Sequence, residues 1–446
     1  MIFNSIKEKF IFYNFPVFLF SLLPLFLITG PFLSDMSLSL ISLLFLIYCM
    51  KKKNFFFFKN KYFYFFLIFW LYLLLNSLMN NFNFDSLKIS FFYFRYGVFV
   101  IALVSLLDVN DKFIKYFFYC IFLCFFILIV DGFYQYFMGE NILGWKTNNS
   151  SRISSFFGEE LILGSYLSKL WPIFFGLSIF FFKKEDKIFF IFVLFFILSE
   201  VLIFLSGERT AFFLINLSAI FVILFSDKLF KLRLTILVFS LFLISIISIF
   251  NPTAKERIID KTISQMNIKD NKINIFNPTA KEKIIDQTIS QINIKDNKIN
   301  IFTRQHTHHY FTAYKMFLDN KILGVGVKNF RKFCGEDKYQ VSNLSCSTHP
   351  HNTYIQILAE TGIIGFLFLV FVFLLFILFL LKHLFLKFKG KYFFTDFEIC
   401  ILSGIAIFLW PFVPTGNVFN NWLNIIICLY PILLIWSRNQ KKLISN

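Results

Sequence analysis

Charged residues are scarce in this chain. Only 16% of its 446 residues are Asp, Glu, Lys or Arg, whereas soluble domains carry about a quarter. Apolar runs repeatedly approach the ~20 residues that cross ~30 Å of hydrocarbon, and 57% of all residues are hydrophobic. These values exclude a soluble globular protein and predict an all-α polytopic membrane protein.

The motifs of several cofactor-dependent classes are also missing. The seven cysteines include no CxxC pair, no HExxH occurs, and Gly324 and Gly326 are not followed by the GK[ST] of a phosphate loop. The two glycines instead predict a tight turn in which backbones pack closely. No small-residue cleavage site follows Leu25 to Gly30, so we expect the first apolar stretch to be an uncleaved span. The net charge of +18 is scattered between apolar runs, which disfavours a nucleic-acid-binding module.

Twelve apolar runs are separated by polar breaks and are predicted to be transmembrane helices. They lie near residues 11–29, 34–50, 62–79, 91–107, 116–138, 160–182, 188–205, 211–226, 234–250, 357–381, 397–413 and 418–436. The predicted organisation is spans 1 to 9 in residues 1–250, a large loop over 251–356, spans 10 to 12 in 357–436, and a tail over 437–446.

Basic residues cluster in alternate connections, which predicts the orientation by the positive-inside rule. With the N-terminus inside, the inner connections and the tail hold Lys51, Lys52, Lys53, Lys59, Lys61, Lys112, Lys115, Lys183, Lys184, Lys187, Lys228, Lys231, Arg233, Lys382, Lys387, Lys389, Lys391, Arg438, Lys441 and Lys442. The short outer connections hold little beyond Lys88, Lys146, Arg152 and Arg209. We therefore expect both termini in the cytoplasm and residues 251–356 outside, where an oxidising periplasm permits a disulfide between Cys334 and Cys346.

The outer segment is too long for a structureless connection, so we expect it to fold with short helices. Within it, Phe250 to Ile275 recurs as Phe276 to Ile301, a tandem copy that differs at three positions. Two copies are too few for a solenoid, which favours a tolerated loop insertion. Each copy has a proline near a helix start and then apolar residues at helical spacing, which is typical of a short amphipathic helix.

Histidines are concentrated in the outer segment. Those in it are His306, His308, His309, His349 and His351. A single histidine is usually structural, but the pair at 349 and 351 directly precedes a span, which indicates a site. Such a pair can also supply two metal ligands; against this, no carboxylate stands at ligand spacing and Pro350 favours an extended turn. The remaining histidine, His383, is on the inner side and is expected to be dispensable.

Three arginines lie at or near outer membrane boundaries: Arg152, Arg209 and Arg304. Taken singly, Arg209 could be a snorkelling helix-end charge paired with Glu208, and Arg152 an exposed loop charge. Together they suggest an anion site, because guanidinium groups bind diphosphate oxygens through two hydrogen bonds. At the outer lipid boundary, such an anion would most naturally be a lipid-linked diphosphate.

Residues 304–366, which include HPHNTYIQILAETGIIGF, resemble the large periplasmic loop and following span of the O-antigen ligase and polymerase superfamily. His351 and Asn352, followed after nine residues by Gly362, match the His-Asn spacing motif of ligases in that family, and Arg209 in SGERTAFF fits it too. The resemblance implies an enzyme of the bacterial inner membrane. It also implies undecaprenyl-diphosphate-linked glycans as donors, without a nucleotide and, in the ligases, without a metal ion or other cofactor.

These residues suggest a mechanism for such a transfer. The arginines would neutralise the departing diphosphate, and His351 would accept the proton of the acceptor hydroxyl, because an imidazole is unprotonated near neutral pH. Asn352 or Glu360 would orient His351, and His349 would contact the substrate. The resemblance implies inversion at the anomeric carbon by a single displacement.

Several alternatives stay open from the sequence. The acceptor is lipid A core in a ligase, another lipid-linked glycan in a polymerase, and a protein in a related oligosaccharyltransferase. A transporter of lipid-linked sugars would suit twelve spans, but its ionisable residues should lie near the bilayer midplane, where Asp131 is the main candidate. A structural or sensory protein would leave the outer histidines and arginines without a shared purpose.

Overall fold

The computed structural model describes residues 6–80, 84–109, 112–147, 152–182, 187–226, 230–260 and 302–445. It is 78% helix, and the described residues form no strand, so the predicted all-α class is confirmed. Eight of the described helices are long and apolar enough to cross a membrane, and three further apolar helices are shorter. The chain is thus a multi-pass membrane protein, while the count of twelve spans stays a prediction.

The described elements follow one another in this order: α1 (Ile6–Lys9), a π-helical segment (Phe10–Asn14), α2 (Phe15–Ser21), α3 (Leu23–Ile28), α4 (Pro31–Lys51), a 3-10 turn (Phe56–Phe58), α5 (Lys61–Met79), α6 (Phe84–Phe92), α7 (Phe94–Val109), α8 (Lys112–Met138), a 3-10 turn (Ser155–Phe157), α9 (Leu163–Phe181), α10 (Lys187–Ser206), α11 (Arg209–Phe225), α12 (Phe230–Phe250), α13 (Pro252–Lys255), a π-helical segment (Glu256–Asp260), α16 (Arg304–Asp319), α17 (Phe330–Phe333), α18 (Thr353–Phe388), α19 (Asp396–Leu409) and α20 (Asn421–Ser445).

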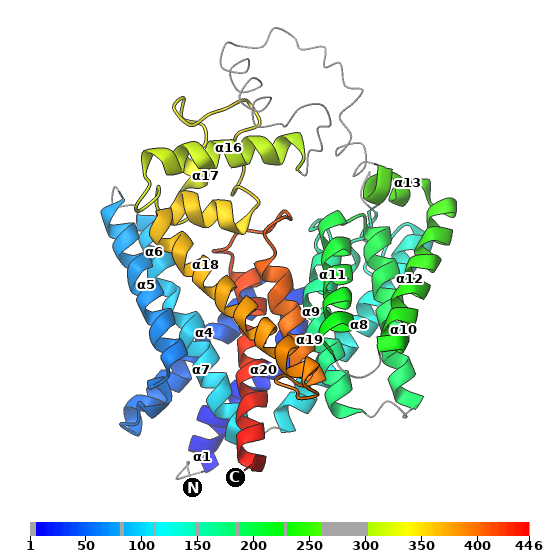
Figure 1. Ribbon diagram of the computed structural model, residues 1–446, viewed down its shortest axis with the longest axis horizontal. Helices are drawn as coiled ribbons and strands as arrows, with labels where there is room; N and C mark the ends of the chain where they lie inside the picture. Colours follow the sequence, from blue (N-terminus) through cyan, green and yellow to red (C-terminus); the bar gives the residue numbers. More distant parts are fainter. Residues whose placement is uncertain are drawn as a thin grey trace.

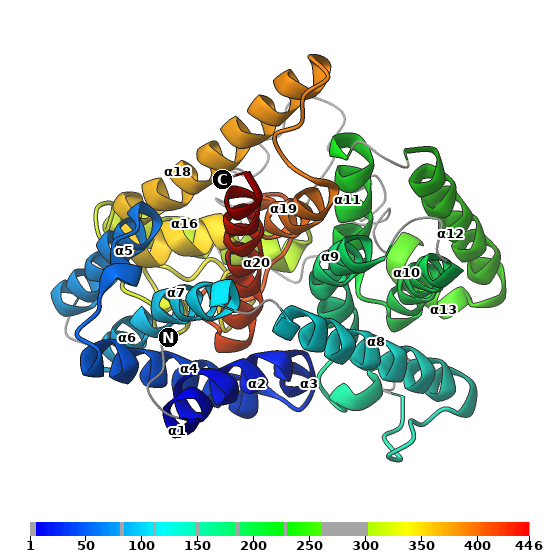
Figure 2. The same ribbon diagram turned by 90° about the horizontal axis from the view of Figure 1, so that it is seen from below.

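The long helices form a bundle that is capped at one end. α1 and the C-terminal end of α20 lie at the end opposite α16 and α17 (Figure 1). α20 lies near the centre of the view from below (Figure 2) and packs against α4, α7, α9 and α19. α9 packs against α10, α11 and α19. The first and last described helices therefore meet at one end of the bundle, and α16 and α17 cap the other end. The cytoplasmic location of the termini stays a prediction.

The predicted glycine turn packs against a break in α18. Gly362, inside this helix, has a φ of 63° and a ψ of −166°. At the break, the backbone N–H of Val325 donates to the carbonyl oxygen of Ala359 at 2.9 Å. A Cβ on Gly324 would lie 2.6 Å from the same oxygen, and one on Gly362 would overlap the carbonyl of Ile322. The close backbone packing expected of the turn is confirmed, and it explains why glycine stands on both sides of the contact.

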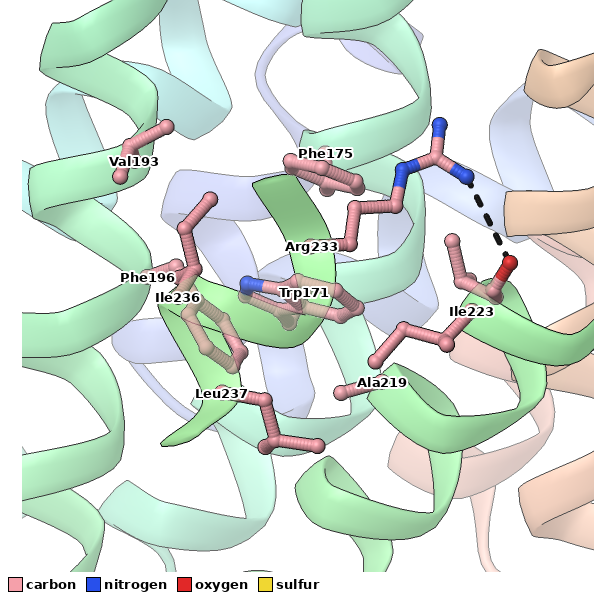
Figure 3. Close-up of a pocket in the computed structure, with 10 residues that line it drawn as sticks. Trp171, Phe175, Val193, Phe196, Ala219, Ile223, Arg233, Ile236 and Leu237 are labelled. Carbon is pink, nitrogen blue, oxygen red and sulfur yellow. Dashed lines mark hydrogen bonds between the residues drawn. The ribbon is translucent and has the colours of Figure 1, made fainter. Parts of the chain in front are cut away.

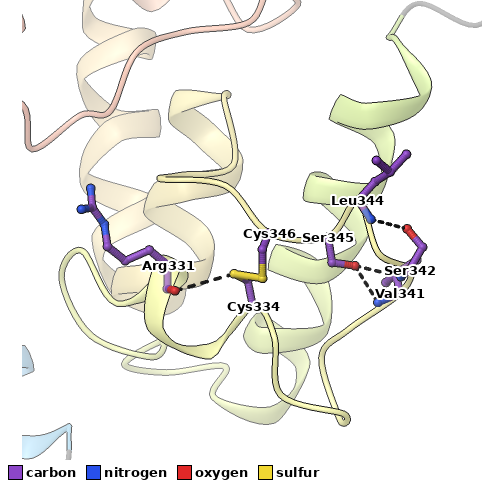
Figure 4. The surroundings of a disulfide bond; sticks show 7 residues. All are labelled: Arg331, Cys334, Val341, Ser342, Leu344, Ser345 and Cys346. Atoms are coloured by element: carbon purple, nitrogen blue, oxygen red, sulfur yellow. Dashed lines mark hydrogen bonds between the residues drawn. A yellow bond between two sulfur atoms is a disulfide. The ribbon is translucent and has the colours of Figure 1, made fainter.

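The described residues 302–356 pack on a small hydrophobic core. A disulfide joins Cys334, directly after α17, to Cys346 (Figure 4). The core beside it comprises Ala313, Met316, Val325, Phe330, Tyr339 and Ala359. In the first repeat copy a helix begins at Pro252, in agreement with the sequence pattern, whereas residues 261–301, including the second copy, lie outside the described part.

Arg233 differs from the solvated inner charge that the sequence suggests. Only 5% of this residue is exposed, and its guanidinium lies among the aromatic side chains of Trp171 and Phe175 in a small cavity (Figure 3). It donates to the carbonyl oxygen of Val222 at 3.4 Å and pairs with Asp396 at 3.5 Å. Because a buried guanidinium must be paired, this arginine holds α12, α11 and α19 together.

Candidate active site

A large cavity lies beside the N-terminal ends of α9, α11 and α18. Its volume is about 850 Å³. The ionisable side chains that line it are Arg152, Lys169, Glu208, Arg209, Arg257, His349, His351, Tyr93 and Tyr430. Much of the remaining lining is apolar and comes from α11, α18, α19 and α20. The structure therefore brings four of the predicted site residues, two arginines and two histidines, from separate parts of the sequence into one cavity.

Three arginines surround the corner between α10 and α11. The Nε of Arg152 donates to the carbonyl oxygen of Ser206 at 3.1 Å. Gly207, at the corner, has a φ of 68°, and a Cβ there would lie 3.1 Å from the Nε of Arg257 and 3.9 Å from the Cγ of Arg152. Burial lowers the pKa of Arg152, and the charge of Arg257 lowers it further, while Glu208 raises it. The corner thus concentrates positive charge that a bound anion would stabilise.

Glu208 holds the corner to α9. Its two carboxylate oxygens accept from the backbone N–H groups of Gly164 at 2.6 Å and Ser165 at 2.9 Å. A carboxylate at a helix N-terminus is favourable, because the first N–H groups of a helix have no partner within the helix. Glu208 therefore fixes the start of α11 against the start of α9.

Two cations of the cavity escaped the sequence reasoning. Arg257 belongs to the first repeat copy, which the sequence suggests is a neutral insertion. One feature of the sequence could have drawn attention to Arg257. The two repeat copies differ at only three positions, and at this one the second copy has Lys283. Lys169 stands alone within the apolar run of α9, one turn after Ser165, which also lines the cavity. An ionisable residue inside a span is itself a signal for function.

Four histidine rings meet beside the arginines. The ring centroids of His349 and His351 lie 4.1 Å apart, and those of His306 and His309, both on α16, each lie 5.4 Å from that of His351. Burial, followed by the neighbouring histidines, lowers the pKa of His306, His309 and His349 to about 4. Burial also lowers the pKa of His351. The charge of Arg209 contributes to the low pKa of His306, so the histidines adjoin the arginine corner.

The two histidines that line the cavity differ in their hydrogen bonds. His349 uses both ring nitrogens: Nε2 donates to the carbonyl oxygen of Thr415 at 3.0 Å, and Nδ1 lies 2.9 Å from the hydroxyl of Thr348. His351 has a φ of 60°, and its Nε2 lies 2.8 Å from the hydroxyl of Ser347. A hydroxyl can donate or accept, so this contact allows either tautomer of His351.

Asn352 and Glu360 have other partners than the sequence suggests. The side chain of Asn352 accepts from the backbone of Tyr354 and donates to the carbonyl oxygen of Pro411 at 2.8 Å, which caps α18. Glu360 is fully buried and accepts from the backbone N–H of Phe330 at 3.2 Å and from a neighbouring glutamine on α18. The described hydrogen-bond partner of the His351 ring is the hydroxyl of Ser347. Both Asn352 and Glu360 instead fix α18 against its surroundings.

Arg304 and Asp131 complete the account of the predicted residues. Arg304 begins α16, and its side chain lies outside the described part. Asp131 is fully buried in α8, where it accepts from the hydroxyl of Ser155 at 2.5 Å and from the backbone N–H of Ile142 at 2.9 Å. These bonds give Asp131 a structural role at the end of α8. It therefore adds no support for a transport pathway.

The residues considered for a metal ion do not form a ligand set. Among the described side chains, no group of three or more His, Cys, Asp or Glu could hold a metal. Both ring nitrogens of His349 face Thr348 and Thr415, and the Nε2 of His351 faces the hydroxyl of Ser347.

Comparison with known proteins finds one family model that matches part of the chain. Residues 192–370 match the family model described as O-antigen ligase. The match runs from α10 to the middle of α18, and so contains Arg209, Arg257, His349 and His351. No curated protein matches the chain. The family consists of glycosyltransferase-like enzymes that act on glycans and lipid-linked substrates. The match supports membership of the O-antigen ligase superfamily.

Proposed function

We propose that this protein transfers a glycan from undecaprenyl diphosphate to a hydroxyl of lipid A core at the periplasmic face of the bacterial inner membrane. The single observation that carries the proposal is the composition of the large cavity, where three guanidinium groups and two imidazoles share a wall with apolar side chains. An anionic headgroup on a long hydrocarbon chain fits such a lining, because the charges and the apolar surface are both matched.

The arginine corner would bind the diphosphate. Arg152, Arg209 and Arg257 present guanidinium groups, which can each form two hydrogen bonds to phosphate oxygens. Negative charge grows on the diphosphate as the bond from the anomeric carbon to its oxygen breaks. Fixed cations at that position stabilise the transition state more than the ground state.

His351 would act as the general base. Its low pKa keeps the ring unprotonated near neutral pH. The described hydrogen bond of its Nε2, to Ser347, leaves Nδ1 to accept a proton if Ser347 accepts from Nε2. The acceptor hydroxyl loses its proton to His351, its oxygen bonds to the anomeric carbon, and undecaprenyl diphosphate leaves with the electrons of the broken bond. A single displacement inverts the anomeric carbon. The steps need no nucleotide or metal ion.

Polymerisation is the second candidate, because the family model covers the superfamily and a polymerase uses the same donor. The lipopolysaccharide ladder of a deletion strain distinguishes the two. Accumulation of long glycan on undecaprenyl diphosphate supports ligase activity, whereas a band with one repeat unit supports polymerase activity. An unchanged ladder and an unchanged lipid-linked pool would refute both, and the chain's own gene should restore the parental pattern while His351→Ala should not.

The orientation rests on the lysine pattern and has its own test. Lys338 in the outer segment and Lys391 between α18 and α19 are both exposed. With Lys338→Cys and Lys391→Cys, we expect an impermeant maleimide to label position 338 from the periplasm and position 391 only after the membrane is permeabilised. Labelling of both from the same side would contradict cytoplasmic termini.

A further inference from the structure

A second cavity adjoins the first and is not used by the mechanism above. Its volume is about 560 Å³, and it lies between α6, α7 and the turn that leads into α17. Five cationic side chains line it, against two carboxylates. Arg95 pairs with Asp35 at 2.7 Å, and Lys332 pairs with Asp85 at 2.9 Å. The lining therefore has an excess of three positive charges.

The excess charge comes from Lys88 on one wall and from Lys328 and Arg331 on the other. Lys328 is half-buried, and burial together with the charge of Arg331 lowers its pKa. Glu360 acts on Lys328 from outside the cavity and offsets only part of this charge. Arg331 is exposed. A half-buried cation beside a second cation is costly unless an anion joins them.

The two cavities share a wall. Tyr93 lines both, and its hydroxyl donates to Asn424, which lines the first cavity, at 3.3 Å. Val418 lines the first cavity, and the next residue, Phe419, lines the second. In addition, the charge of Arg331 lowers the pKa of His349, so this arginine lies close to the histidine cluster. A molecule anchored in the second cavity is therefore close to the groups that perform the transfer.

We propose that the second cavity binds a phosphate group of the acceptor through Lys88, Lys328 and Arg331, and so positions the acceptor hydroxyl toward the histidine cluster. The inference rests on the proposed function, because it assigns the acceptor half of the same reaction. The shared chemistry is a phosphorylated saccharide. Its source is either a phosphorylated lipid A core or a second glycan on undecaprenyl diphosphate.

The test is a transfer assay with purified full-length protein, in which the donor is saturating and the acceptor concentration is varied. Arg331→Gln and Lys88→Gln, on opposite walls, should each raise the KM for a phosphorylated acceptor about 10- to 100-fold, the scale of a lost charge-assisted contact, while the KM for the donor stays unchanged. Lys338→Gln is the control, since Lys338 belongs to the same segment but pairs with Glu336 at the surface. A dephosphorylated acceptor should abolish the difference between wild type and variants.

Two acceptor arms identify the source of the phosphate. If KM rises only with lipid A core, the cavity serves a ligase; if it rises only with a second lipid-linked glycan, it serves a polymerase. Unchanged acceptor KM in both arms, or a raised donor KM, overturns the inference while leaving the proposed function intact. Absence of transfer and of released undecaprenyl diphosphate with wild-type protein would instead refute the proposed function. Formation of the disulfide between Cys334 and Cys346 reports that each variant has folded.

Discussion

The arginine corner and the histidine cluster of the large cavity are held by different parts of the molecule. The arginine corner lies at the ends of membrane helices, where hydrogen bonds of Glu208 join α11 to α9. The cluster stands on α16 and on the turn before α18, in the outer segment with its own core and disulfide. Guanidinium charge persists at every working pH, whereas a buried imidazole changes state with pH. Binding of an anion and acceptance of a proton are therefore separable in this protein.

Loss of the base should be the largest single effect. We expect His351→Ala to lower kcat about 10²- to 10⁴-fold, with little change in the KM of the donor, because the arginine corner is untouched. The measurement is transfer by purified protein, with release of undecaprenyl diphosphate as the readout. His308→Gln is the matched control, since His308 is on α16 but bonds to Ser342 at 2.5 Å.

The choice between the two cavity histidines is part of the same test. His349 bonds to Thr348 and to the carbonyl oxygen of Thr415, so His349→Ala should disturb the turn and lower activity less than His351→Ala. If His351→Ala kept wild-type transfer and His349→Ala lost it, the base would be His349.

Loss of an arginine of the arginine corner should lower kcat by a similar or smaller factor than loss of the base. Arg209→Ala should lower kcat about 10²- to 10³-fold, whereas Arg209→Lys should restore only part of the rate, because a lysine keeps the charge but not the two-point geometry. Unlike the histidine variant, Arg209→Ala should also weaken donor binding. Full activity in Arg209→Lys would show that this residue merely marks the end of α11.

The tandem repeat allows a test of Arg257 within the arginine corner, because the second copy has a lysine at the matching position. Removing residues 250–275 or residues 276–301 gives two chains of equal length that differ at only three positions, one of which is Arg257 or Lys283. We expect the chain without 276–301 to keep activity within about twofold, because the free energy of loop closure changes only slowly with loop length. The chain without 250–275 should lose about 10-fold, since lysine replaces the guanidinium beside Gly207.

A reciprocal substitution completes that experiment. Lys283→Arg in the chain without 250–275 should restore the rate, and Arg257→Lys in the full chain should reproduce the loss. Equal activity of the two shortened chains would mean that the guanidinium of Arg257 takes no part in binding the diphosphate.

The sequence predicts which residues lie near one another better than it predicts their contacts. Arginines and histidines at outer span ends are visible in a hydropathy pattern, and the structure brings four of them into one cavity. Lys169 and Arg257 were hidden because one stands inside an apolar run and the other inside a repeat. Which face of a helix meets a cavity depends on tertiary packing, which the hydropathy pattern does not contain.

His383 illustrates the same limit at the other end of the bundle. The sequence suggests a dispensable inner histidine. In the structure this residue is buried, its Nε2 donates to the carbonyl oxygen of Phe225 at 3.0 Å, and its Nδ1 accepts from the backbone N–H of Phe394 at 3.2 Å. It therefore joins α18 to α11 and to the start of α19. The expectation of dispensability applies to the chemistry but not to stability.

The change of activity with pH should be the smallest effect. It is also the effect that best separates the role of the histidine cluster from that of the arginine corner. Because burial lowers the pKa of His351, the base stays unprotonated at pH values where a free imidazole, with a pKa of ~6.5, is half-protonated. We expect kcat/KM, which reports the free enzyme, to stay level from pH 7.5 to 6.5 and to fall only below that. A midpoint at or above about 6.5 would contradict a buried base.

Two checks make this profile interpretable. Arg209→Lys should lower the whole curve without moving its midpoint, because neither side chain changes charge in this range. Folded histidines with lowered pKa values bind protons less readily than the unfolded segment does, so the outer segment loses stability as the pH falls from about 6.5 toward 4. Activity must therefore return fully when acid-treated protein is brought back to pH 7. An irreversible loss would indicate that the histidine cluster has unfolded, rather than that His351 has been protonated.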